Sequence, residues 1–276
     1  MSLSIDLDAY FRRIGYSGPR EPTLETLRGL HRLHPRAIAF ENLDPLTDVV
    51  PALDLGGLQA KLVAAGRGGY CFEQNGLFLA VLRALGFEAQ GLAARVVWMT
   101  PPERVGGRTH MLIRVVLPEG VFLADVGFGG LVLTAPLRLI AGPEQDTGDG
   151  VLQLVEAGEG ELQLQFRIGD AFQPKYLLSQ LPQTPADYGL ANWFVATHPS
   201  SIFRRNLIVS RVAEDHRLGL LNGDLSIRWR DGRAEKRSLD LDGVCVALVD
   251  QFGLPPAAVE AARPAIGNIM EAQKAS

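Results

Sequence analysis

The sequence predicts an α+β fold in three consecutive parts: a helical domain over residues 1–87, a β-domain over 88–184 and a mixed α/β segment over 185–276. In the first part, apolar residues recur every three or four positions, which is typical of amphipathic helices. Beyond residue 88, short runs rich in valine, leucine and isoleucine replace that pattern, and several alternate with polar residues, as strands do. These changes of pattern set the two boundaries.

Four helices are expected in the first part, over residues 6–14, 24–34, 56–65 and 73–85. Thr23 can cap the second of them. We expect it to stop before Pro35, because the residue preceding a proline disfavours the helical conformation. His31 and His34 lie on or at the end of this helix among arginines and leucines, and are expected at the surface.

Strands are expected over residues 89–99, 111–117, 121–128, 151–156, 161–168, 207–212, 218–221, 225–229 and 234–239. A glycine-containing turn at 158–160 indicates a hairpin, and turns at 222–224 and 231–232 separate later strands. Thr184 can cap a helix over 185–196. A helix over 242–252 and a shorter one after Pro256 are expected to close the chain.

The composition is that of a soluble globular protein, and neither a metal site nor a membrane-spanning segment is expected. A net charge of −4 and a pI near 5.8 argue against a general nucleic-acid binder. No apolar run approaches the ~20 residues that cross a bilayer. Residues 1–6 lack the pattern of a secretory signal, so a cytoplasmic location is expected. Two cysteines do not make a disulfide scaffold, and no Cys/His cluster has zinc-site spacing.

Cys71 is the candidate nucleophile. It lies in the stretch Arg-Gly-Gly-Tyr-Cys-Phe-Glu-Gln-Asn, residues 67–75, between two predicted helices. Unpaired N–H groups and the helix dipole at the following helix start favour the thiolate. Gly68 and Gly69 permit a sharp turn and are expected to leave room for a substrate. The alternative is a buried thiol acting as a small apolar residue, as we expect for Cys245.

His110 and Asp125 are the candidate partners of that cysteine. His110 opens an apolar strand after a glycine loop, and Asp125 stands within an apolar strand, where an unpaired carboxylate is costly. In an antiparallel hairpin that pairs Val116 with Val121, Asp125 becomes a diagonal neighbour of His110. A slip of one residue would put them on opposite faces. The alternative is a satisfied core histidine and a loop-capping aspartate.

Three blocks together resemble the signature of the arylamine N-acetyltransferases: residues 67–75, Thr-His-Met at 109–111 and Asp-Val-Gly-Phe-Gly at 125–129. Ala-Phe-Glu-Asn-Leu at 39–43 is similar to a further block of that family. The resemblance implies a barrel-like antiparallel β-domain, a C-terminal α/β lid and a Cys–His–Asp site of the cysteine-protease-like type. It also implies ping-pong acetyl transfer from acetyl-CoA to an arylamine or arylhydrazine.

The resemblance also implies roles for individual residues. Cys71 would carry the acetyl group, His110 would be the base and Asp125 would orient it. Glu41 and Arg67 match positions that form a structural ion pair. The expected substrate contacts are Phe40, Thr109, Phe128 and Phe203. The expected CoA contacts are Gly106, Gly107, Gly127 and Gly129, of which the last two could instead admit the cysteine turn.

Other interpretations stay open at this point. A thiol triad also serves cysteine hydrolases and transglutaminase-like enzymes, and a binding protein could keep a relict triad. Phe203 suits core packing as well as substrate stacking. The three arginines Arg204, Arg205 and Arg211 could meet CoA phosphates or form a solvated basic face.

Overall fold

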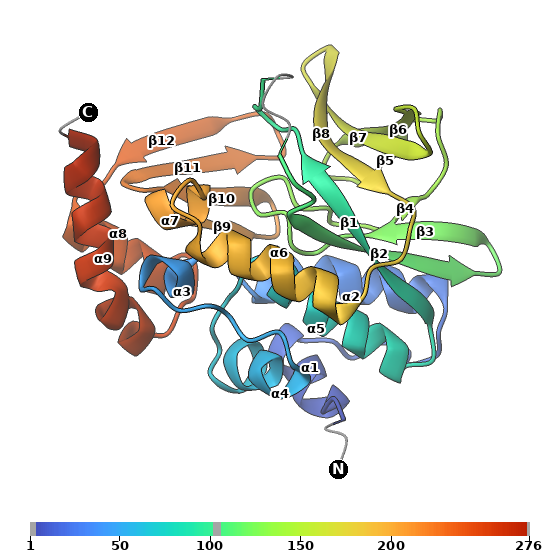
Figure 1. Ribbon diagram of the computed structural model, residues 1–276, viewed down its shortest axis with the longest axis horizontal. Coiled ribbons are helices and arrows are strands. Elements are labelled where there is room, and N and C mark those ends of the chain that lie inside the picture. The colour runs from blue at the N-terminus through green and yellow to red at the C-terminus, as the bar shows by residue number, and fades with distance from the viewer. Residues whose placement is uncertain (1–3, 102–105, 275–276) are drawn as a thin grey trace.

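The computed structural model describes residues 4–101 and 106–274. Residues 1–3, part of the segment compared above with a secretory signal, lie outside the described residues. Helices form the lower part of the molecule in Figure 1. The N-terminal helices are α1 (Leu7–Ile14), α2 (Leu24–Ala37), α3 (Leu43–Leu46), α4 (Leu55–Leu58), the π-helical turn η1 (Gln59–Ala64) and α5 (Cys71–Ala84). Asp6 caps α1 by accepting the Ala9 N–H at 2.9 Å.

Two helix boundaries differ from the sequence expectation. The helix α2 continues through Pro35 to Ala37, and the Ile38 N–H still donates to the His34 carbonyl at 2.9 Å. A proline so near the end removes only one N–H, and the rest of the turn remains bonded. The helix α5 begins at Cys71, two residues earlier than expected, so the cysteine itself is the first helical residue.

An eight-stranded antiparallel sheet, nearly closed into a barrel, forms the centre of the molecule, in the order β4-β3-β2-β1-β8-β7-β6-β5. Its strands are β1 (Glu88–Val96), β2 (His110–Leu117), β3 (Gly120–Ala124), β4 (Leu137–Arg138), β5 (Gln145–Asp146), β6 (Val151–Glu156), β7 (Glu161–Ile168) and β8 (Ala171–Ser179). Val116 pairs with Val121, as the hairpin prediction requires. The strand β8 was not expected, because Pro174 and Lys175 interrupt its alternation.

The C-terminal part contains a second antiparallel sheet, in the order β12-β11-β10-β9. Its elements are α6 (Pro185–Thr197), α7 (Ile202–Arg205), β9 (Ile208–Val212), β10 (His216–Leu221), β11 (Asp224–Trp229), β12 (Ala234–Ser238), α8 (Leu241–Asp250) and α9 (Pro256–Lys274). Figure 1 shows α8 and α9 beside this sheet, and their apolar side chains share one core with it. Cys245 is partly buried at the edge of that core.

The last helix is longer than expected: α9 spans 19 residues and includes Pro264. Its buried residues, among them Val259, Ile266 and Met270, pack into the core of the second sheet. Burial of this apolar face stabilises the helix although a proline removes one of its hydrogen bonds. The sequence pattern after Pro256 was broken by that proline, which is why a shorter helix was expected.

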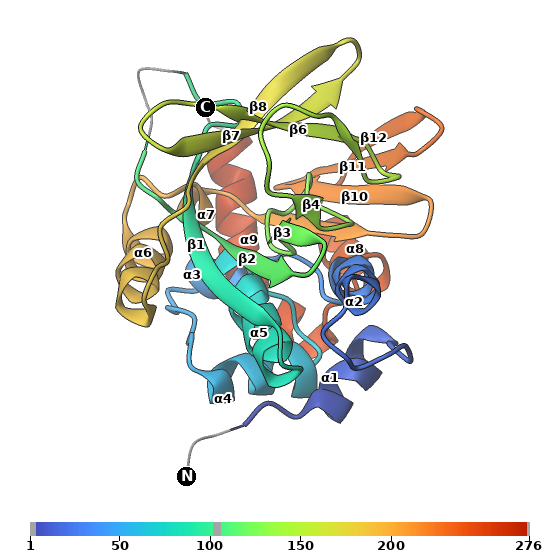
Figure 2. The same ribbon diagram turned by 90° about the vertical axis from the view of Figure 1, so that its right-hand side faces the viewer.

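The helix α5 is the link between the helical part and the central sheet. Figure 2 shows it against β1 and β2, and the largest core joins its side chains to those of the N-terminal helices and of β1 to β3. This packing puts the N-terminus of α5 against the beginning of β2. A division at residues 87 and 184 stays a prediction. Within the described ranges, no helix is long and apolar enough to cross a membrane.

Candidate active site

The sulfur of Cys71 lies against the start of β2, close to the residue before His110 and to the residue after it. Its Sγ atom is 3.6 Å from the carbonyl oxygen of Thr109, the residue before the histidine. On the other side, the backbone N–H of Met111 donates to the sulfur. Cys71 is 4% exposed and is therefore a buried residue. The packing of α5 on β2 therefore brings Cys71 to the position of His110.

The ionisation of Cys71 differs from the sequence expectation. Burial, together with the charges of Asp125 and Glu73, raises the pKa of the thiol to about 12. Backbone hydrogen bonds of Met111, on β2, and of Phe72, in the first turn of α5, lower the pKa, and only the second is an effect of the helix N-terminus. The loss of hydration outweighs them. The start of α5 therefore acts on the thiol in the predicted direction, but burial has the larger effect and the pKa of Cys71 is raised overall.

His110 and Asp125 are in direct contact. The Nε2 atom of His110 lies 2.9 Å from Oδ2 of Asp125, and both side chains are almost fully buried. Burial raises the pKa of the Asp125 carboxyl, but His110, Lys175 and Asn75 lower it well below its usual range. An ionised carboxylate only accepts hydrogen bonds, so Nε2 carries the hydrogen and Nδ1 is left as the ring's proton acceptor.

Asp125 is held by residues to which the sequence analysis assigned no role at the site. The Asn75 amide donates to its Oδ1 at 3.1 Å, from the helix that carries Cys71. The backbone N–H of Asp125 donates to His31 Nε2 at 3.1 Å. His31 and His34 are both fully buried, so the prediction of surface histidines was wrong. Arginines flank these histidines, but the histidines themselves lie on the inner face of α2.

Lys175 and Tyr176 complete the surroundings of Asp125. Both are fully buried, and both come from β8, the strand that was not expected. The Lys175 Nζ atom lies 3.9 Å from Asp125 Oδ2. The Asp125 charge also adds to the effect of burial in raising the pKa of Tyr176. A lysine within an apolar strand was the available signal, by the same reasoning that identified Asp125.

Two glycines explain how the segments approach so closely. A Cβ atom on Gly127 would lie 2.9 Å from the Cys71 Cα atom and 2.8 Å from Asn75 Nδ2. A Cβ on Gly68 would lie 2.2 Å from the Ala39 carbonyl oxygen. Gly127 thus lets its loop pack on the cysteine turn. The space beside Gly68 is filled by the protein's own backbone, so the expectation of substrate room there was wrong.

An ion-pair network lies beneath the cysteine turn. Arg67 Nη2 is 2.8 Å from Glu41 Oε1, which confirms the expected pair. The network extends further than predicted, since Arg67 also binds Asp44, and Lys61 joins Asp44 to Glu73 at 2.7 and 2.6 Å. Glu73 in turn accepts the Tyr70 N–H at 3.1 Å. Buried charges in this arrangement fix the turn before Cys71.

The four aromatic and polar residues expected to contact substrate fall into two groups. Phe40 and Phe203 lie together, with ring centroids 5.9 Å apart, and Tyr70 joins Phe203 at 5.7 Å. Phe128 instead lies edge-on to the His110 ring at 5.2 Å. Thr109 lies next to the sulfur through its carbonyl. Gly129 connects the groups, because a Cβ there would lie 3.5 Å from the Phe40 ring.

The glycines expected at the CoA arm occupy two places. Gly106 and Gly107 lie in an exposed loop just before Thr109, with open space around them. Gly127 and Gly129 follow Asp125, and Gly129 has a positive φ of 86°. Of these four glycines, Gly127 lies against Cys71, where a Cβ would be 2.9 Å from its Cα atom. Within the described residues, no group of histidine, cysteine, aspartate and glutamate is arranged to hold a metal ion.

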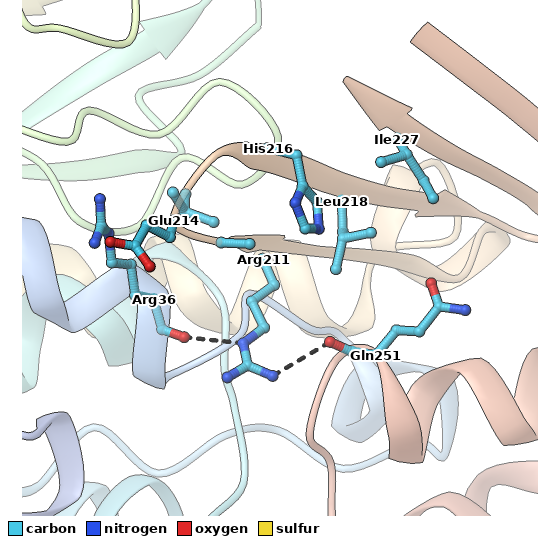
Figure 3. A pocket seen from close by; sticks show the side chains of 9 residues that line it. Arg36, Arg211, Glu214, His216, Leu218, Ile227 and Gln251 are labelled. Atoms are coloured by element: carbon cyan, nitrogen blue, oxygen red, sulfur yellow. Dashed lines mark hydrogen bonds between the residues drawn. The ribbon is translucent and has the colours of Figure 1, made fainter. Parts of the chain in front are cut away.

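A cavity of about 460 Å³ lies elsewhere, between the end of α2 and the second sheet. Figure 3 shows Arg36, Arg211, Glu214 and His216 at its wall. The Arg211 guanidinium donates to the carbonyls of Arg36 and Gln251 at 2.9 and 3.2 Å. Cys71 does not line this cavity. Arg204 and Arg205 likewise donate to backbone carbonyls, of Pro45 and Pro199.

The fold and this cluster define a class of proteins in which a cysteine at a helix N-terminus faces a histidine and a carboxylate held by an antiparallel sheet. A family model described as N-acetyltransferase matches residues 23–259. The chain belongs to the arylamine N-acetyltransferase family. It is 40% identical to an arylamine N-acetyltransferase of Mycolicibacterium smegmatis, over 91% of this chain and 93% of that protein.

Two further relatives give the same result. An arylamine N-acetyltransferase of Escherichia coli strain K12 is 41% identical over 90% of this chain and 88% of the relative. The solved structure of the Mycobacterium marinum arylamine N-acetyltransferase in complex with CoA superposes with a TM-score of 0.90 at 42% identity. That match covers 96% of this chain and 98% of the other.

Proposed function

We propose that this protein transfers the acetyl group of acetyl-CoA to arylamines and arylhydrazines in two steps, through an acetyl–Cys71 intermediate. The observation that carries the proposal is the contact of the Cys71 sulfur with the residues on both sides of His110, whose ring is paired with Asp125. Cys71 is the nucleophile, His110 the base and Asp125 the residue that orients the base. Family membership and the CoA complex of a relative support the choice of acyl donor.

In the first step the sulfur attacks the thioester carbonyl of acetyl-CoA. Because burial raises the pKa of the thiol to about 12, ionisation to bulk solvent is rare near neutral pH. The proton therefore passes to His110 Nδ1, and the Asp125 carboxylate stabilises the imidazolium that forms. The C–S bond to CoA then breaks, and the CoA sulfur takes the proton back from His110. One thioester replaces another, so the acetyl group keeps its reactivity.

The negative oxygen of the tetrahedral intermediate needs donors at the start of α5. The N–H groups of Glu73 and Gln74 already donate to the Tyr70 carbonyl, at 3.1 and 3.0 Å. This leaves the N–H group of Cys71, and that of Phe72, which acts on the sulfur in the resting protein and can turn to the oxyanion once the sulfur is acylated. Each such donor contributes on the order of 3 kcal/mol to stabilisation of the transition state.

In the second step the amine attacks acetyl–Cys71. Its lone pair is delocalised into the aromatic ring, so it needs a thioester rather than an ester as acyl donor. His110 takes the amine proton and returns it to the Cys71 sulfur as the C–S bond breaks. Phe40, Phe128 and Phe203 are the candidate stacking partners for the ring. Thr109 is a candidate contact of substrate, and the four glycines Gly106, Gly107, Gly127 and Gly129 are candidate contacts of the CoA arm.

Intact mass spectrometry tests the proposal. Incubation with acetyl-CoA should add one acetyl group, which peptide mapping should place on Cys71 and which an arylamine should remove. The Cys245→Ala variant should behave like the unaltered protein, because Cys245 packs at the edge of a separate core. A folded protein that takes up no acetyl group would overturn the proposal in favour of a hydrolase, a transglutaminase-like enzyme or a binding protein. We place the activity in the cytoplasm, where acetyl-CoA is available.

A further inference from the structure

Lys175 is a fully buried cation at the candidate active site. Its Nζ atom makes no hydrogen bond with any of the described residues, and its nearest opposite charge is Asp125 Oδ2 at 3.9 Å. Burying an ammonium group without compensation is expensive. Neither step of the acetyl transfer outlined above uses this charge. We therefore expect the Lys175 ammonium either to serve the active site or to be stabilised by its other neighbours.

The aromatic rings of the site surround the ammonium group. Nζ lies 4.1 Å from the Phe128 ring centroid and 4.9 Å from that of Tyr176. Both rings also contact the His110 ring, at 5.2 Å each. The faces of aromatic rings attract a cation, which offsets part of its lost hydration. The ammonium, the Asp125 carboxylate and the His110 imidazole therefore form one buried cluster.

Counting charges shows what the lysine contributes. A thiolate, an imidazolium and the Asp125 carboxylate would carry a net charge of −1, and Lys175 brings the cluster to zero. The negative charge of Asp125 opposes ionisation of Cys71, and a positive charge beside that carboxylate cancels the effect. Asp125 can thus orient His110 without repelling the thiolate.

We propose that Lys175 is a positioning residue of the active site, whose ammonium neutralises Asp125 so that Cys71 can ionise beside His110. This role rests on the proposed function. It differs from a packing role because it depends on the charge of the side chain. It also explains why the lysine lies beside Oδ2, the same carboxylate oxygen that binds the histidine.

The other titratable and charged groups around Lys175 bear on the pH range of this effect. Tyr176 on β8, His110 on β2, His31 on α2 and Arg217 on β10 act on the same cluster. Burial lowers the pKa of Lys175 to about 8, Asp125 raises it and Arg217 lowers it. The group is therefore charged near neutral pH, and its field fades as the pH rises above about 8.

The test compares Lys175→Met, which removes the charge at similar size, with Lys175→Arg, which keeps it. The rate of Cys71 alkylation by iodoacetamide is measured against pH in the Cys245→Ala background. We expect the midpoint for Lys175→Met to rise by about one pH unit, and that for Lys175→Arg to stay near the original value. Lys236→Met, at an exposed position on β12, is the control for a distant charge and should not move the midpoint.

A second measurement guards against loss of folding. Asp125→Asn leaves a bare buried ammonium and should lower the urea midpoint of unfolding, whereas Lys175→Met in the Asp125→Asn background should recover part of that loss. An unshifted alkylation midpoint in folded Lys175→Met, or additive losses in the double variant, would overturn the proposal. Acetyl uptake is measured separately. A shifted alkylation midpoint without acetylation refutes only the proposed function. Acetylation with an unshifted alkylation midpoint refutes only the role of Lys175.

Discussion

Asp125 Oδ2 accepts a hydrogen bond from His110 Nε2 at 2.9 Å, although His110 opens β2, Asp125 directly follows β3, and the two are 15 positions apart. The hairpin pairing ends at Ile113 and Ala124, and Asp125 is the first residue beyond it. The carboxylate is thus diagonal to the histidine on the inner face. Its backbone N–H is fixed by His31 and its second oxygen by Asn75. The imidazole orientation is therefore set by two helices as well as by the hairpin.

The first prediction concerns this contact. Asp125→Asn should reduce alkylation of Cys71 by iodoacetamide near neutral pH by roughly 10³-fold or more, because an amide neither fixes the tautomer nor stabilises the imidazolium. We expect the fold to persist at reduced stability. Asp215→Asn is the control, since that carboxylate is exposed and pairs with His216, away from Cys71. Alkylation that stays fast in folded Asp125→Asn would show that Asp125 does not hold the base.

The second prediction uses two glycines of the same loop. Gly127→Ala should slow acetylation of Cys71 by about 10²-fold, because its Cβ would displace the cysteine turn or Asn75. Gly130→Ala should have little effect, since a Cβ there meets nothing within 4 Å. Stopped acetylation reactions analysed by mass spectrometry measure both rates. Equal rates for the two variants would mean that close approach at Gly127 is unimportant.

The third prediction concerns stability and pH. Burial lowers the pKa of His31 to about 4 and that of His34 to about 3, below the unfolded value near 6.5. The unfolded chain therefore binds more protons, so stability is complete above about pH 6.5 and is lost as the pH falls towards 4. Each histidine contributes a slope of at most about 1.4 kcal/mol per pH unit.

His34→Gln should remove the contribution of one of these groups. The free energy of unfolding is measured with urea at several pH values between 4 and 7, which is roughly the interval between the folded and unfolded pKa values. Its slope against pH should be visibly smaller for His34→Gln than for the original protein. His198→Gln, at an exposed position after α6, should leave the slope unchanged. A slope unaffected by His34→Gln would mean that this histidine already binds its proton in the folded state.

The fourth prediction separates the two half-reactions. Phe203→Ala should raise the KM for an arylamine by about tenfold, as expected for the loss of one stacking contact, but should leave acetylation by acetyl-CoA nearly unchanged. Steady-state kinetics and intact mass measure the two quantities. Phe172→Ala, on β8 beside Arg167, is the control and should alter neither. A stability loss without any change in KM would assign Phe203 to core packing.

Local patterns were enough to predict much of this protein. The cysteine block, the register of the hairpin that brings Asp125 to His110, and the caps at Thr23 and Thr184 all depend on residues close together in the chain. In such cases steric preference and a short loop determine the geometry, and the alternation of side chains fixes which face each residue occupies.

The tertiary structure decided the rest. The packing of a helix on the sheet decides whether a histidine of α2 faces solvent or Asp125. The packing of a distant strand decides whether Lys175 lies under the aromatic rings. Burial also decided the ionisation of Cys71, because loss of hydration outweighs the helix N-terminus that the sequence does reveal. Hydration is a property of the whole packed core, and no single segment of the chain carries it.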